Sequence, residues 1–123
     1  MREVYCDYCG RRAELVSSKV IYGRDYGHKV WLCRNCMAYV GCHRNTDKPF
    51  GRFANAELRY WKRAAHKAFD PIWQYGRFRG HRSAAYGWLA QKMNLPAEKT
   101  HIGMFDVDDC KRAIRICNAE RRR

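Results

Sequence analysis

The sequence predicts an α+β fold, in which three short antiparallel strands at the N-terminus pack on about three helices at the C-terminus. Three observations indicate this fold. Two Cys-x-x-Cys pairs lie near the N-terminus, runs rich in Val, Ile, Tyr and Trp lie between and after them, and apolar residues recur with helical spacing in the second half of the chain. The 123 residues suffice for one compact domain, which we divide into residues 1–44 and 52–123.

The two Cys-x-x-Cys pairs consist of Cys6, Cys9, Cys33 and Cys36. Two residues between thiolates allow one tight turn, or knuckle, to direct both sulfurs at one tetrahedral ion, and a second knuckle completes a four-sulfur shell. We therefore predict one structural Zn²⁺ that is held by all four cysteines. A shell filled by protein ligands has no position for water, so this zinc would not act as a Lewis acid. Two unrelated thiol pairs, or a redox Cys-x-x-Cys, are the alternative.

The segments 14–22 and 29–33 are predicted to be strands because they are rich in β-branched and aromatic residues. Gly23 to Gly27 form the turn between them, and residues 37–42 are predicted to be a third strand. The order knuckle, strand, strand, knuckle, strand is typical of a zinc ribbon. Since extended chain carries Cys42 roughly 20 Å from the second knuckle, we predict a buried thiol there and not a ligand.

Three segments are predicted to be helical, namely 54–69, 83–94 and 106–123. The first is expected to end at Asp70, because Pro71 disfavours helix in the residue before it. Ser83 and Asp106 are the predicted N-caps of the second and third helices. The third helix would bury an apolar stripe that includes two further thiols, Cys110 and Cys117.

The formal net charge is +13, from 25 basic and 12 acidic residues, and residues 51–82 hold eight Lys or Arg against two acids. Such an excess favours an anionic partner. We predict nucleic-acid binding of low specificity, and an acidic host protein or an ordinary solvated helix face are the alternatives. The predicted backbone contacts come from one face of the first helix and the loop after it: Arg59, Lys62, Arg63, Lys67, Arg77, Arg79 and Arg82.

Several stretches, among them CDYCG, CRNCMAYVGCH and HIGMFDVDDC, together resemble a family of small zinc-finger-containing domains that occurs in bacteria and their phages. The resemblance spans roughly residues 5–117. It implies a zinc-bound cysteine quartet and a phage or prophage origin, and it supplies no activity. It also suggests that GCHRNT and HIGMFD belong to a shared functional or structural surface.

Three function classes follow from these observations: a nucleic-acid-binding zinc protein, a phage effector that binds a host protein, and a nuclease. The nuclease reading rests on His43 as a metal ligand or base, or on Asp106, Asp108 and Asp109 as a cation site. It is simpler to interpret His43 as a polar loop residue and the three aspartates as part of a helix cap, so we predict no catalytic residue. No apolar run approaches the ~20 residues of a membrane span, and a cytoplasmic location is expected.

Overall fold

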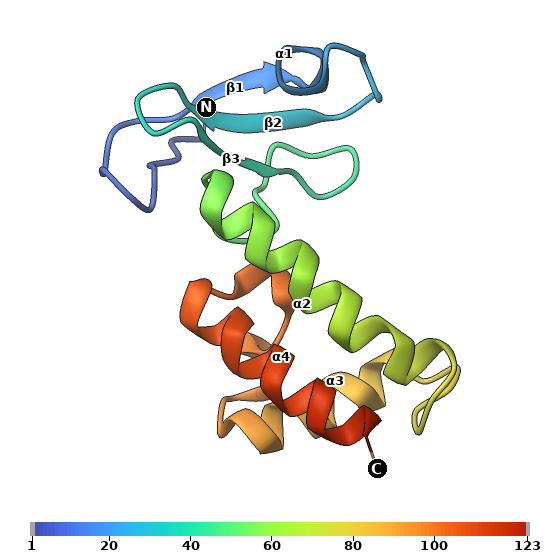
Figure 1. Cartoon of the computed structure of the whole chain (residues 1–123). Coiled ribbons are helices and arrows are strands. Elements are labelled where there is room, and N and C mark those ends of the chain that lie inside the picture. The colour runs from blue at the N-terminus through green and yellow to red at the C-terminus, as the bar shows by residue number, and fades with distance from the viewer. Residues whose placement is uncertain (1, 123) are drawn as a thin grey trace. The chain divides into compact units, whose positions relative to one another are not determined.

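The computed structural model describes residues 2–122, and the chain divides into two compact units (Figure 1). The cysteine unit, Met1–Ala56, contains β1 (Glu14–Ser17), α1 (Ser18–Tyr22), β2 (Lys29–Cys33) and β3 (Ala38–Gly41). The helical unit, Glu57–Arg123, contains α2 (Ala56–Gln74), α3 (Arg82–Met93), α4 (Val107–Arg121) and the 3-10 turns η1 (Ala97–Lys99) and η2 (Ile102–Met104). The boundary between the units falls after Ala56, the first residue of α2. The predicted α+β class, with three antiparallel strands ahead of the helices, is confirmed.

The three strands form one antiparallel sheet in the order β1-β2-β3, with Trp31 of β2 opposite Leu15 of β1 and Val40 of β3. Alternate residues of β2 point to opposite faces of the sheet. Trp31 and Cys33 belong to one buried cluster, whereas Val30 and Leu32 belong to another. The central strand is therefore covered on both faces, and its last residue is one of the predicted metal ligands.

The first strand is shorter than predicted, because residues 18–22 form the short helix α1 instead of extended chain. The oxygen of the Ser17 side chain accepts a hydrogen bond from the backbone N–H of Lys19 at 3.2 Å, which caps the helix. Gly23 ends the helix with a φ of 72°. The expectation of strand for residues 18–22 was wrong because these two local caps outweigh the β preference of Val20 and Ile21.

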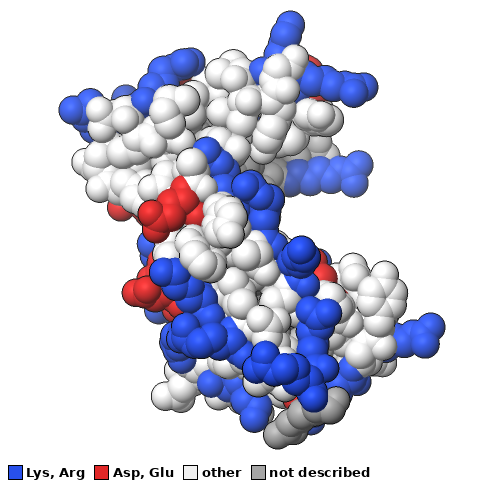
Figure 2. Space-filling view, in the orientation of Figure 1, with Lys and Arg blue, Asp and Glu red and all other residues white. Residues whose placement is uncertain are grey.

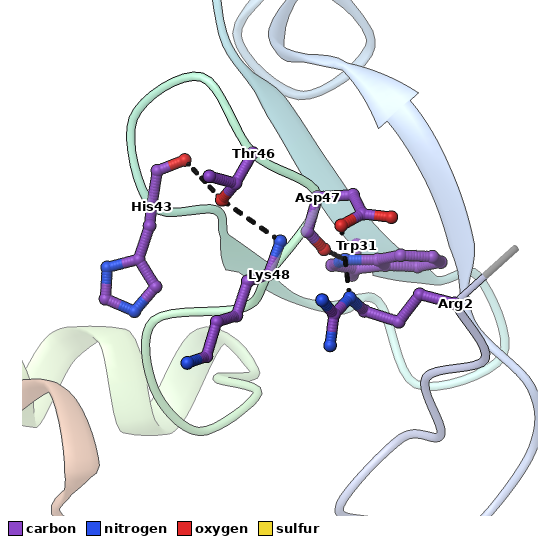
Figure 3. Close-up of polar contacts among 6 residues, drawn as sticks. All are labelled: Arg2, Trp31, His43, Thr46, Asp47 and Lys48. Carbon is purple, nitrogen blue, oxygen red and sulfur yellow. Dashed lines mark hydrogen bonds and ion pairs between the residues drawn. The ribbon is translucent and has the colours of Figure 1, made fainter.

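The loop after β3 is held by the contacts drawn in Figure 3, among Arg2, Trp31, His43, Thr46, Asp47 and Lys48. The hydroxyl of Thr46 donates to the carbonyl oxygen of His43 at 2.9 Å, and the indole N–H of Trp31 donates to the carbonyl oxygen of Asp47 at 2.6 Å. The carboxylate of Asp47 also pairs with Arg2 at 3.1 Å. These contacts give the GCHRNT stretch a structural role, and the imidazole of His43 points away from them.

The helix α2 continues through Pro71 to Gln74, so the predicted end at Asp70 was wrong. Phe69 and Ile72, which flank the proline, are both buried. The carbonyl oxygen of Pro71 accepts hydrogen bonds from the N–H groups of the next turn at 2.9 and 3.0 Å. Burial on both sides of Pro71 therefore outweighs the local cost of a proline inside the helix.

The core of the helical unit is formed by its largest fully buried side chains: Leu58, Phe69, Leu89, Met93, Ile102 and Phe105. Ile102 and Phe105 come from the HIGMFD stretch, which therefore anchors the connection between α3 and α4 in the core. His101, the first residue of the stretch, is exposed. HIGMFD thus combines two structural side chains with one imidazole at the surface.

The sequence predicts the first residues of α3 and α4 with mixed success. α3 begins one residue early, at Arg82, so that Ser83 lies in its first turn and His81 takes the cap position without a side-chain hydrogen bond. The prediction of Ser83 as the cap was wrong. At α4 the prediction is confirmed, because the N–H of Asp109 donates to the Asp106 carboxylate at 2.8 Å within a capping box.

Candidate functional site

The first knuckle, at Cys6 and Cys9, is a turn that the backbone closes on itself. The N–H of Gly10 donates to the carbonyl oxygen of Cys6 at 3.0 Å, and Gly10 has a φ of 75°, a conformation that L side chains rarely adopt. The N–H of Tyr8 donates to the sulfur of Cys6 at 3.3 Å. The turn therefore orients both sulfurs and supplies one hydrogen bond to a ligand atom.

The second knuckle brings Cys33 and Cys36 to the same point. Cys33 is the last residue of β2, and Cys36 lies in the turn that leads to β3. All four sulfurs lie within 4.8 Å of one another, and those of Cys9 and Cys33 are 3.6 Å apart. A tetrahedral zinc ion with Zn–S distances of about 2.3 Å needs sulfurs about 3.8 Å apart. The donor type, number and spacing of the cluster thus fit zinc.

Within residues 2–122, no other set of three or more Cys, His, Asp or Glu side chains comes together closely enough to hold a metal ion. His43 does not reach the cysteine cluster, and Asp106 and Asp109 are used by the capping box. The structure therefore offers one candidate metal centre in the described part of the chain, and it is the predicted one.

The cluster changes the acidity of its thiols in different directions. A hydrogen bond from the backbone N–H of Arg11 lowers the pKa of Cys9 to about 7. Burial raises the pKa of Cys6 and raises that of Cys36 to about 12. Crowded thiols are costly to ionise together, and a divalent cation removes that cost because it favours the thiolate form. Metal binding at this cluster therefore releases protons.

The first knuckle also fixes the segment that leaves the sheet. The carboxylate of Asp7 accepts a hydrogen bond from the N–H of Phe53 at 2.8 Å, and the hydroxyl of Tyr8 accepts one from the N–H of Asn55 at 3.2 Å. Phe53 is buried in the same cluster as Cys6 and Cys33. Residues between the cysteines of the knuckle thus tie the chain beyond β3 to the cysteine cluster, a role that spacing alone does not reveal.

The other three cysteines, Cys42, Cys110 and Cys117, are buried as predicted. We expect them to react slowly with iodoacetamide in the folded protein, because the thiolate is the reactive form and burial raises all three pKa values, to about 11 for Cys110 and about 12 for Cys117. Brief alkylation of native and urea-unfolded protein, followed by peptide mass spectrometry, measures the difference. Equal labelling of these three cysteines in both states would contradict the burial.

The predicted basic residues occupy different environments. Arg63, Lys67, Arg79 and Arg82 are exposed. Arg77 is also exposed, and its guanidinium pairs with Glu120 of α4 at 3.1 Å. Arg59 and Lys62 are less exposed to solvent, since both are half-buried. The ammonium group of Lys62 also donates to the carbonyl oxygen of Gly103 at 2.8 Å. The structure therefore gives Lys62 a part in holding η2 against α2.

Sequence reasoning missed the basic residues of α4, because it interpreted residues 106–123 as a capped core helix. Lys111 and Arg115 are exposed, and the ammonium group of Lys111 lies 5.0 Å from the centre of the Trp61 ring on α2. The helical unit holds fifteen Lys or Arg and seven Asp or Glu, a formal charge of +8. Figure 2 shows Lys and Arg gathered along this unit, with few acidic side chains among them.

None of the helices in residues 2–122 has the length and the apolar character that crossing a membrane requires. In comparison with known protein families, the model of a family described as a zinc-finger-containing domain matches residues 2–120. No curated protein and no solved structure matches the chain. The matched range includes the cysteine cluster and all four α-helices almost to the end of α4.

Proposed function

Because the chain belongs to this family of zinc-finger-containing domains, we propose that it is a zinc-stabilised protein that binds nucleic acid through its helical unit. The observation that carries the proposal is the excess of exposed cations on that unit. We define the basic surface as seven exposed cations, which come from α2, from the loop before α3 with the first residue of α3, and from α4: Arg63, Lys67, Arg77, Arg79, Arg82, Lys111 and Arg115.

The zinc ion in this proposal is structural. Cys6, Cys9, Cys33 and Cys36 would hold it, and an ion with four protein ligands stabilises the fold without offering a position for a substrate. Cys6 and Cys33 are themselves part of the buried cluster of the sheet. The metal centre would therefore complete the hydrophobic core of the cysteine unit, which supports a role in folding and not in chemistry.

Two contacts support α2 and α4 as one binding surface. Lys111 of α4 lies over Trp61 of α2, and Glu120 of α4 pairs with Arg77 beyond the end of α2. The two helices are therefore neighbours along their length, and cations line both. A row of cations that neutralises successive phosphates gains affinity from the release of counterions, with little dependence on base sequence.

We expect the protein to bind duplex DNA, single-stranded DNA and RNA with an affinity that falls steeply as salt rises. If about six phosphates are neutralised, the affinity for duplex DNA falls roughly 10³-fold between 50 and 200 mM salt. Fluorescence anisotropy with labelled oligonucleotides of unrelated sequence, measured across that salt range, gives the slope. Failure of the zinc-loaded protein to bind any of the three at ~100 mM salt would overturn the proposal.

A protein partner is the second candidate function, because exposed cations also suit an acidic protein surface. In that case the protein would retain acidic proteins from a bacterial lysate treated with nuclease while binding no nucleic acid in the anisotropy series. The same two measurements therefore separate the two proposals.

A further inference from the structure

The hollow beside the first turns of α3 has a composition that the zinc site and the phosphate contacts do not explain. It has a volume of about 450 Å³ and is lined by Arg82, Ser83, Tyr86, Gly87, Ala97 and His101. Hollows of roughly 300–1,000 Å³ accommodate small molecules. The wall thus combines a cation, a hydroxyl, an imidazole and a phenol ring around a space of ligand size.

The cation and the rings of this hollow are held in place by one another. The guanidinium of Arg82 lies 5.7 Å from the centre of the Trp73 ring and 5.6 Å from that of Tyr86. The imidazole of His101 lies 4.8 Å from the Tyr86 ring. Stacking between Arg82 and two aromatic rings limits its motion while its charge remains available. The hollow therefore presents a positioned cation next to a planar imidazole that is exposed.

Gly87 is the second unexplained feature. It lies in the interior of α3, where glycine is disfavoured relative to alanine. A Cβ atom added at this position would meet no heavy atom within 4 Å, so close packing does not require a glycine. Since Gly87 lines the hollow, the missing side chain leaves open a space that any larger residue would occupy.

We infer that this hollow binds one unpaired nucleotide of a single-stranded nucleic acid. The base stacks on the imidazole of His101 beside Tyr86, and the adjoining phosphate meets Arg82 and the hydroxyl of Ser83. Arg77 and Arg79, which precede Arg82 in the chain, provide contacts for the neighbouring phosphates. The inference rests on the proposed nucleic-acid binding and adds to it a preference for unpaired strands, because a base inside a duplex cannot enter the hollow.

The test fills the hollow without changing the charge. Gly87→Gln places a side chain in it, and Ala84→Gln is the matched control, because Ala84 is exposed on the same helix and does not line the hollow. Binding is measured by anisotropy with a single strand, the same strand carrying abasic positions, and the corresponding duplex. Circular dichroism establishes that both variants keep the helical content and the melting temperature of the parent protein.

Gly87→Gln is expected to weaken binding of the single strand roughly tenfold, the loss expected for one base-stacking contact, and to leave duplex binding unchanged. Abasic positions should weaken binding to the parent protein by a similar factor and have no further effect on Gly87→Gln, because both changes remove the same contact. Ala84→Gln should behave as the parent protein does.

If Gly87→Gln binds the single strand as tightly as Ala84→Gln does while salt-dependent duplex binding persists, the nucleotide site is wrong and the proposed function stands. If no nucleic acid binds at all, both are overturned. A nucleoside monophosphate, followed through the NMR signals of His101, distinguishes the sources of the ligand. The strand should bind more tightly than the monophosphate, and equal affinity would identify a free nucleotide as the ligand and overturn the inference.

Discussion

Removal of the metal is expected to unfold the cysteine unit while the helical unit keeps its structure. The cysteine unit has only a three-stranded sheet and two small buried clusters, and one of them includes the ligands Cys6 and Cys33. Structural zinc sites contribute ~10–16 kcal/mol near pH 7, which is comparable to the ~5–15 kcal/mol by which whole domains are stable. The sheet is therefore not expected to survive without the ion.

The expected result is measured with Cys33→Ser and with a strong chelator added to the parent protein. In both cases the measured zinc content should fall from one ion per chain to none. Backbone amide signals of β1, β2 and β3 should collapse to the narrow range of an unfolded chain. Signals of α2, α3 and α4 should stay dispersed, because the core around Phe69 and Phe105 contains no ligand.

Cys42→Ala is the matched control for this experiment. Cys42 is buried in the same cluster as Cys33, yet it is not among the four sulfurs that come together. Its truncation should leave one zinc ion per chain and a folded sheet of somewhat lower stability. A Cys33→Ser protein that keeps both its zinc and its sheet would show that the cluster is not the metal centre.

The cysteine cluster and the start of α4 are the parts that sequence reasoning predicts best, since each depends on a short local pattern. Two residues between cysteines limit how a knuckle can turn, and Asp106 with Asp109 forms a cap within one turn of helix. The predictions failed where a local preference is outweighed by contacts with distant residues, or where several weak local preferences compete. Pro71 lies inside α2 because Phe69 and Ile72 are buried on both sides of it.

The candidate nucleic-acid surface could be predicted only in outline. Helical periodicity places Arg63 and Lys67 on an outer face, and the structure agrees. It does not reveal that Lys62 is engaged by Gly103, a residue far along the chain, because that contact depends on the position of η2. The hollow beside α3 escapes sequence reasoning for the same reason, since His101 reaches Tyr86 only through the tertiary fold.

Reversal of three charges on the basic surface is expected to weaken nucleic-acid binding roughly 100-fold or more at ~100 mM salt, because three phosphate contacts are lost. The variant Arg63→Glu, Lys67→Glu, Arg79→Glu avoids Lys62, whose contact with Gly103 has a structural role. All three residues are exposed, so zinc content and melting temperature should not change. The slope of log affinity against log salt for duplex DNA should become less steep by about 2.7.

The matched control reverses three exposed cations of the cysteine unit, in Arg24→Glu, Arg44→Glu, Lys48→Glu. Both triple variants lower the net charge by the same amount, so long-range attraction changes equally, and only the helical variant removes the proposed contacts. We expect the control to lose only a few-fold in affinity and to keep the parental salt slope. Equal losses in the two variants would mean that net charge, and not the basic surface of α2 and α4, governs binding.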